Sequence, residues 1–145
     1  MRKYFIVFVS VCFLAACNGR IKKEVVEKYP NGNPKIERHF KMNNGEKELV
    51  KEIGYFPDKK LYMEGDYKNS KRNGKWSSWY QNGKLWSEGY FKNGLSDSIR
   101  TTYYENGNKR YEGFYKNGVK VGKWKFWLEN GKFDKEVDLS LTPAP

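Results

Sequence analysis

The sequence predicts an all-β protein: a single antiparallel β-meander of about ten strands, built from 24-residue hairpin repeats. Three observations lead to this prediction. The dipeptide Asn-Gly recurs every 24 residues, at Asn82-Gly83, Asn106-Gly107 and Asn130-Gly131. A second Asn-Gly set lies eleven residues after the first two, at Asn93-Gly94 and Asn117-Gly118. Glu-Gly keeps the same period, at Glu64-Gly65, Glu88-Gly89 and Glu112-Gly113.

Each Asn-Gly of the first set predicts a hairpin. Both central residues of a type I′ turn need positive φ, which Asn tolerates and Gly adopts freely. The strand pairs expected around these turns are Trp76–Gln81 with Lys84–Phe91, Arg100–Glu105 with Asn108–Tyr115, and Trp124–Glu129 with Lys132–Val137. Two earlier hairpins are expected from Val25–Tyr29 with Lys35–Lys41 and from Glu48–Phe56 with Lys60–Tyr67. Longer links, such as Lys92–Ser98 and Lys116–Lys123, would join one hairpin to the next.

A two-residue turn fixes which residues face each other across a hairpin. It predicts Trp76 opposite Gly89 and Trp79 opposite Trp86. The face that carries Trp76 is the predicted core, because it collects most of the large apolar side chains. Its expected members are Trp76, Tyr80, Leu85, Gly89, Phe91, Tyr104, Tyr111, Gly113, Tyr115, Trp124, Phe126, Leu128, Phe133 and Val137.

The opposite face is predicted to carry one pair of large side chains in each hairpin. These pairs are Tyr55 with Tyr62, Trp79 with Trp86, Tyr103 with Arg110, and Trp127 with Asp134. Strand spacing would repeat them about every 10 Å along the sheet. Two interpretations stay open: cross-strand packing worth roughly 0.2–1 kcal/mol per pair, or a contact stripe for a partner. Because Trp, Tyr and Arg dominate binding hot spots, the predicted binding residues are Trp79, Trp86, Tyr103, Arg110 and Trp127.

The stretch from Trp76 to Gly94, WSSWYQNGKLWSEGYFKNG, resembles the MORN-repeat variant family of bacteria. The resemblance covers roughly residues 29–133. Many members look like the antitoxin component of a toxin–antitoxin module. The resemblance therefore implies a non-enzymatic protein-binding scaffold of antitoxin or immunity type, whose partner would be a toxin or another envelope protein.

Two places depart from the pattern of this family. Pro57-Asp58-Lys59 stands at a turn that is Asn-Gly in later repeats. Ser98-Ile99-Arg100 stands where Gly-Lys-Trp is expected, as at residues 74–76 and 122–124. The first departure suits a terminal repeat that caps the stack, whereas the sequence offers no explanation for the second.

The N-terminus predicts export and a lipid anchor. Arg2 and Lys3 precede an apolar run, which is typical of a signal peptide over residues 1–16. Leu14-Ala15-Ala16-Cys17 resembles the bacterial lipobox, so Cys17 is the predicted lipidation site. Residues 17–24 are then a tether, residues 25–138 the repeat domain and residues 139–145 a disordered tail. The expected location is the cell envelope outside the cytoplasm. Asn18 after Cys17 favours the outer membrane if the host has two membranes.

No motif in the sequence predicts catalysis, a metal site or a cofactor. His39 is the only histidine, so a histidine-based metal site would lack further ligands. Glu64, Glu88 and Glu112 occur once per repeat, which indicates a structural role rather than a pair of catalytic carboxylates. We therefore expect no enzyme activity.

The chain is strongly basic, with 28 Lys and Arg against 17 Asp and Glu and a formal net charge of +11. Positive surfaces attract nucleic acid, anionic lipid or acidic partners. Nucleic acid is not an expected partner outside the cytoplasm. Binding of envelope polysaccharide, cell-wall glycan or an anionic surface stays an alternative to protein binding. A purely structural role as an envelope spacer is a third possibility.

Overall fold

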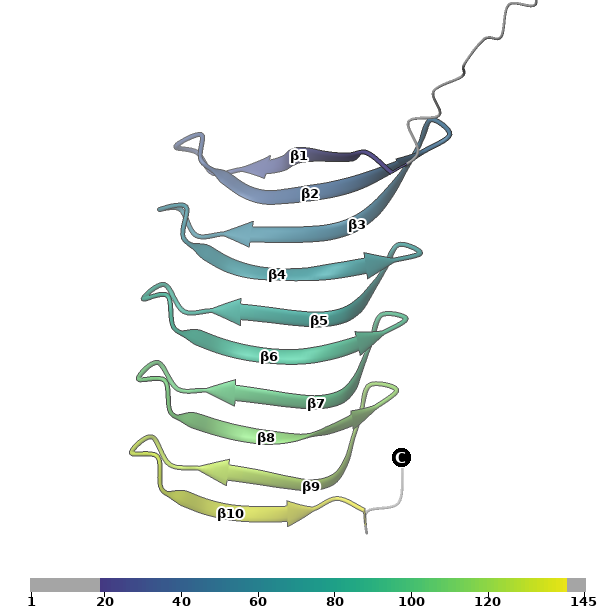
Figure 1. The fold of residues 1–145 in the computed structure, drawn as a ribbon. Coiled ribbons are helices and arrows are strands. Elements are labelled where there is room, and N and C mark those ends of the chain that lie inside the picture. The colour runs from purple at the N-terminus through teal and green to yellow at the C-terminus, as the bar shows by residue number, and fades with distance from the viewer. Residues whose placement is uncertain (1–18, 141–145) are drawn as a thin grey trace, which may run out of the picture.

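The computed structural model describes residues 19–140, which form one open antiparallel sheet of ten strands arranged in chain order (Figure 1). The strands are β1 (Ile21–Lys28), β2 (Pro34–Asn43), β3 (Glu46–Tyr55), β4 (Leu61–Lys68), β5 (Lys71–Trp79), β6 (Leu85–Lys92), β7 (Leu95–Tyr103), β8 (Lys109–Lys116), β9 (Val119–Trp127) and β10 (Phe133–Asp138). The predicted all-β meander is confirmed. These residues contain no helix, and hence none that could cross a membrane.

The predicted signal peptide and Cys17 lie outside the described residues, as do residues 141–145 of the predicted tail. β1 begins at Ile21 and pairs with β2, so part of the segment predicted as a tether is a strand. At the other end, the Leu139 amide donates a hydrogen bond to the Gly122 carbonyl over 2.9 Å.

The Asn-Gly sites predicted as two-residue type I′ turns form three-residue loops, on the left in Figure 1. The Gly83 amide donates to the Tyr80 carbonyl, and the Tyr80 amide donates to the Lys84 carbonyl, both over 2.9 Å. Gly83 has φ of 85°, whereas Asn82 is not among the residues with positive φ. This is a type I turn followed by a glycine bulge. The I′ prediction is wrong here because the Asn82 Oδ1 accepts the Lys84 amide over 2.9 Å, which holds the type I turn.

The segments predicted as longer links contain the two-residue turns, on the right in Figure 1. Lys92 pairs directly with Leu95 across Asn93-Gly94, whose φ angles are 52° and 88°. Asn117-Gly118 repeats this geometry with φ angles of 51° and 84°. Positive φ at both central residues defines the type I′ turn. Tight turns therefore close both ends of every strand pair in this part of the sheet.

Each three-residue loop shifts the strand pairing next to it by one residue from the predicted pairing. Trp76 lies opposite Gly89, as predicted, but Trp79 pairs with Leu85 instead of Trp86. The same shift separates the other predicted pairs: Tyr55 pairs with Leu61, Tyr103 with Lys109, and Trp127 with Phe133. The extra residue in each case is Tyr62, Trp86, Arg110 or Asp134. The predicted pairing is wrong because a loop with one more residue moves that residue into a bulge.

A second bulge explains the Gly-Lys-Trp signature and its exception. Gly74, Ser98 and Gly122 are 24 residues apart and have φ of 77°, 67° and 64°. Each lies next to a shift in strand pairing. Ser98 therefore occupies the same left-handed position as the two glycines, although a side chain is disfavoured there.

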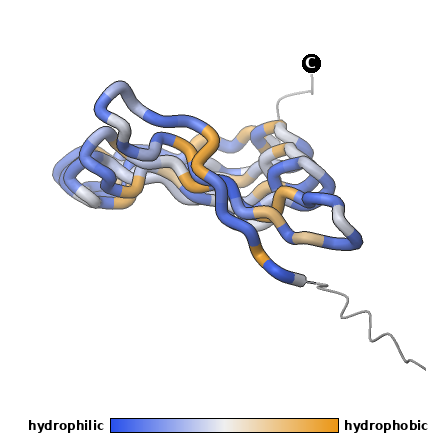
Figure 2. Tube along the Cα trace, turned by 90° about the horizontal axis from the view of Figure 1, so that it is seen from above, coloured by the Kyte–Doolittle hydropathy of each residue, from blue (hydrophilic) through white to orange (hydrophobic). Residues whose placement is uncertain are grey.

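The sheet is a single layer, so few side chains are fully buried. Only Trp76 and Trp124 are buried large apolar residues in the described part, with 7% and 2% of their surface exposed. The predicted core face is wrong at Leu85 and Phe133, which pair with Trp79 and Trp127 on the opposite face because of the shifted register. Most of its other side chains are half-buried, whereas Leu128 and Val137 are exposed, as is Phe133. No second layer covers them. Hydrophobic positions lie interspersed among hydrophilic ones along the whole chain trace (Figure 2).

Side chains in the three-residue loops also connect successive repeats. The Asn106 Oδ1 accepts the Asn108 amide over 2.9 Å, while the Asn106 Nδ2 donates to the Glu129 carbonyl of the next loop over 2.7 Å. Asn82 makes the equivalent bonds to Lys84 and to Glu105. The recurring asparagine therefore both closes its own turn and ties it to the next one.

Candidate binding face

One face of the sheet carries a row of stacked side chains, and we call it the aromatic face. Tyr67 and Trp76 lie with ring centroids 5.5 Å apart, and Trp76 and Phe91 lie 5.9 Å apart. Two repeats after Trp76, Tyr115 and Trp124 form a T-shaped contact at 5.2 Å. These edge-to-face arrangements are favourable for aromatic pairs and stabilise them beyond area burial. The row crosses the sheet from β4 to β9.

Arg100 occupies the place in this row where the neighbouring repeats carry tryptophan. Its guanidinium carbon lies 5.5 Å from the Phe91 ring centroid and 5.5 Å from that of Tyr115. Cation–π contacts therefore continue the stack through the middle repeat. Residues 76, 100 and 124 are 24 residues apart, so they occupy equivalent positions in three successive repeats. Arginine replaces tryptophan at this position in the middle repeat.

Bare glycines make room for the tryptophan rings. A Cβ built on Gly65 would lie 2.1 Å from the Trp76 Cδ2, and one on Gly113 would lie 2.2 Å from the Trp124 Cδ2. Trp76 pairs with Gly89 across β5 and β6, as the sequence predicts. The Trp76 ring, however, covers Gly65 on the preceding strand, β4. The side chain of Arg100 lies over Gly89 instead, and a Cβ built on Gly89 would lie 3.1 Å from the Arg100 Nε.

Further cations lie against the row. The Arg72 guanidinium carbon is 4.1 Å from the Trp76 ring centroid and 5.7 Å from that of Phe91. The Lys120 Nζ is 4.6 Å from the Trp124 ring centroid. Two positively charged groups therefore reach Phe91, since Arg100 approaches the same ring.

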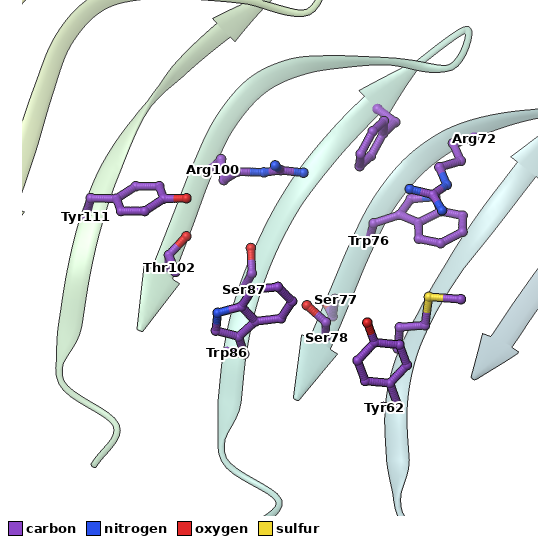
Figure 3. A pocket seen from close by; sticks show the side chains of 12 residues that line it. Tyr62, Arg72, Trp76, Ser77, Ser78, Trp86, Ser87, Arg100, Thr102 and Tyr111 are labelled. Carbon is purple, nitrogen blue, oxygen red and sulfur yellow. The ribbon is translucent and has the colours of Figure 1, made fainter. Parts of the chain in front are cut away.

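A groove of about 270 Å³ opens on the aromatic face (Figure 3). Its lining is Tyr62, Met63, Arg72, Trp76, Ser77, Ser78, Trp86, Ser87, Phe91, Arg100, Thr102 and Tyr111. Thr102 is only 3% exposed, and its hydroxyl has no hydrogen-bond partner. The Nε of Arg100 is likewise buried without a partner.

The opposite face is occupied by ion pairs, and we call it the ion-pair face. Glu64 binds Lys51 and Glu88 binds Lys75, each over 2.7 Å. Glu136 repeats the contact with Lys123 over 3.0 Å. In the repeat between the last two, Ile99 stands at the lysine position and Glu112 instead binds Lys109 over 2.7 Å. The recurring glutamates therefore each bind a lysine, which comes from the neighbouring strand in three repeats and from the same strand at Glu112.

The electrostatics of the ion-pair face follow from these contacts. The hydrogen bond from Lys75 lowers the pKa of Glu88, and the same bond raises the pKa of Lys75. Burial raises the pKa of Tyr103, whose hydroxyl donates to the Glu88 Oε1 over 3.2 Å. The recurring glutamates of this face are therefore compensated by neighbouring lysines.

The two faces differ in their acidic side chains between β4 and β9. Strand register and alternation place every acidic side chain of these strands on the ion-pair face. They are Glu64, Asp66, Glu88, Asp97 and Glu112. The aromatic face of the same strands carries Arg72, Arg100 and Lys120 without any carboxylate. Its positive charges therefore have no carboxylate of these strands on the same face, whereas the lysines of the ion-pair face share that face with carboxylates.

The predicted binding residues do not share one face. Trp86 lines the groove on the aromatic face and is 40% exposed. Arg110 lines a neighbouring hollow with Tyr111 and Phe126. Trp127 borders this hollow too, but strand alternation and its ring contact with Lys109 place it on the ion-pair face. Tyr103 lines a hollow on the ion-pair face, and alternation places Trp79 on that face too. The single stripe is therefore divided by the loop bulges, while a binding role for its members stays a prediction.

Sequence reasoning missed Arg72, Arg100 and Thr102 as potential binding residues. The substitution of Arg100 into the tryptophan period was the one available signal. Thr102 gave none, since its burial depends on the neighbouring strands. Within residues 19–140, no three His, Cys, Asp or Glu side chains cluster in a way that could hold a metal.

Comparison with known families gives a match at three places. The MORN repeat variant matches residues 21–42, 72–93 and 97–117. These segments contain the hairpins β1–β2, β5–β6 and β7–β8, each with its three-residue loop. No curated protein and no solved structure matches the chain.

Proposed function

From the premise that the chain carries the MORN repeat variant at three places, we propose that it is a non-enzymatic scaffold whose aromatic face binds a partner protein. MORN repeats are common in proteins that interact with other proteins or bind membranes. The observation that carries the proposal is the distribution of acidic side chains: the aromatic face has none from β4 to β9, so that Arg72, Arg100 and Lys120 share their face with no carboxylate of these strands.

The aromatic face also has the composition of a binding hot spot. Trp86 and Tyr62 are 40% and 39% exposed beside the groove, and Arg72 and Arg100, which also line it, lie against the stacked rings. Trp, Tyr and Arg contribute most strongly to interfaces when a partner buries them. A partner that covers this face would bury rings that the single-layer sheet leaves in water.

The finer part of the proposal concerns location and biological role. We place the scaffold at the cell envelope, anchored through lipidated Cys17, and in the outer membrane if the host has two. Its role would be that of an antitoxin or immunity-type protein, and the partner a toxin or another envelope protein. This rests on the resemblance to MORN-variant antitoxin components and on the lipobox-like Leu14-Ala15-Ala16-Cys17.

A capture experiment with face-specific variants tests the proposal. Full-length tagged chain, solubilised from its native envelope, is compared with Trp86→Ala on the aromatic face and Trp79→Ala on the ion-pair face. We expect the same partner protein to be retained by the wild type and by Trp79→Ala, and lost with Trp86→Ala. Equal capture by both variants, with both folded by circular dichroism, would refute binding through the aromatic face.

Envelope polysaccharide is the second candidate ligand. The stacked rings recur along the aromatic face, and the groove adds the hydroxyls of Ser78 and Ser87, so a sugar chain could contact both. A sedimentation assay with purified cell wall separates the two ligands. Pelleting that Trp86→Ala abolishes would support the glycan, and its absence at low salt would reject it. A structural spacer would give neither a captured protein nor pelleting.

A further inference from the structure

Arg72 and Arg100 are cations that lack an acidic partner. The ion pairs formed within residues 19–140 include neither of them. Arg38 shows the contrast, because it lies in the same cross-strand row as Arg100 and its Nε binds the Glu52 Oε2 over 2.8 Å. The sheet therefore supplies a carboxylate to one arginine of this row and none to the other.

Two buried hydrogen-bond donors lie at the groove. The Nε of Arg100 and the hydroxyl of Thr102 are both buried and unpartnered, and both residues line the groove. A buried polar group without a hydrogen bond is destabilising, and native proteins rarely retain one without a reason. Thr102 is 97% buried, yet it lies beside the groove floor next to Tyr111 (Figure 3). An acceptor atom entering the groove would satisfy these donors.

The separation of the two guanidinium groups is also limited. Both lie against the Phe91 ring, at 5.7 Å for Arg72 and 5.5 Å for Arg100. Because both lie against one ring, the two guanidinium carbons are no farther apart than the sum of these two distances. A guanidinium stacked on a ring keeps its N–H edge available for bidentate contact with a carboxylate.

We propose that this groove binds an acidic segment of the partner protein, with one carboxylate at Arg72 and a second at Arg100 and Thr102. The inference rests on the proposed protein-binding function and identifies the chemistry of the partner. A polyproline II segment has three residues per turn and rises about 3.1 Å per residue. Acidic residues three positions apart would then lie on one side, about 9 Å from each other, which is within the largest separation that the contacts with Phe91 allow for the two guanidinium carbons.

Short peptides test this spacing with the full-length chain. A peptide containing Glu-Pro-Pro-Glu is titrated by calorimetry beside Gln-Pro-Pro-Gln, which lacks charge, and Glu-Glu-Pro-Pro, which has the same charge at the wrong spacing. We expect saturable binding of the first and at least tenfold weaker binding of the other two. Equal binding of all three, or of the two charged peptides, would overturn the proposal.

Matched variants locate the binding site. Arg72→Gln and Arg100→Gln should each weaken the peptide at least tenfold. Lys75→Gln removes the same charge from the ion-pair face and should change the affinity less than twofold. If Lys75→Gln weakens binding as much as Arg100→Gln, net charge and not the groove explains the result. Should Arg100→Gln fail to fold, Arg100→Lys keeps the charge without the planar fork, and it should still lose about tenfold.

Other anions give distinct outcomes. Inorganic phosphate that matches the affinity of Glu-Pro-Pro-Glu would show a general anion site and overturn the peptide assignment. Anionic lipid vesicles that bind through Arg100, with no peptide binding, would assign the groove to a membrane surface instead.

If Arg100→Gln abolishes peptide binding but not capture of the envelope partner, the groove assignment fails and the scaffold function stands. If the wild type captures no partner, the scaffold function itself fails.

Discussion

The indole of Trp124 lies directly on the backbone of Gly113, so that a Cβ at that glycine would lie 2.2 Å from the Trp124 Cδ2. Trp124 is 2% exposed, and it is the most buried large side chain of the described residues. Because the sheet has no second layer, this contact takes the place of a hydrophobic core. It buries one large ring against the backbone of a residue without a side chain.

Gly113→Ala should therefore destabilise the protein by about 3 kcal/mol or more, because the indole would have to leave its position. Gly89→Ala is the matched control, since the atom nearest to its built Cβ is the Nε of flexible Arg100 at 3.1 Å. We expect that variant to lose less than about 1 kcal/mol. The free energy of unfolding from urea titration measures both. Equal losses would mean that the ring contact is not what makes glycine necessary.

Ser98→Gly should stabilise the protein by about 0.5–1 kcal/mol, because Ser98 has φ of 67° where Gly74 and Gly122 stand in the neighbouring repeats. Ser98→Ala keeps a Cβ in the left-handed region and should bring no such gain. Thermal unfolding followed by circular dichroism compares the three chains. A lower melting temperature for Ser98→Gly would show that the serine makes a contact that outweighs the strain.

Asn106→Asp should cost about 1–2 kcal/mol, because it replaces the Nδ2 that donates to the Glu129 carbonyl by a charged acceptor. The bond from the Asn108 amide to the side-chain oxygen would be kept. Asn130→Asp in the last loop is the control: its amide oxygen accepts the Lys132 amide, and no further loop follows. We expect less than about 0.5 kcal/mol there. Similar losses at both positions would argue against the connection between loops.

Stability should fall on acidification as the carboxylates of the ion-pair face become protonated. The Lys75 hydrogen bond holds the pKa of Glu88 below 4.5, its value in the unfolded chain. A lowered folded-state pKa stabilises the protein above the unfolded value and ceases to do so as the pH falls through the folded one. The wild type should therefore lose more stability than Lys75→Gln between about pH 5 and pH 3.

Urea midpoints at several pH values measure this difference. Lys132→Gln is the matched control, because it removes an exposed lysine that makes no ion pair within residues 19–140. It should follow the wild-type pH profile. A Lys75→Gln profile that also follows the wild type would show that solvent screens the Lys75–Glu88 pair completely.

The sequence determined the period, the number of strands, the antiparallel order and the pairing of Trp76 with Gly89. These follow from local chemistry, because Asn-Gly must turn and the aromatic segments on either side must pair. The positions of the turns were therefore predictable, and so was the structural role of one glutamate per repeat.

The tertiary structure decided which turn each Asn-Gly forms, and thereby which side chains share a face. The Asn82 side chain bonds its own loop and the next one, and such contacts between repeats are invisible in a single hairpin. One extra loop residue moves Trp86 to the groove side of the sheet while Trp79 stays on the other. Because side chains alternate with a period of two, a shift of one residue exchanges the faces. The contact between Arg100 and Phe91 likewise depends on strands that only the folded sheet brings side by side.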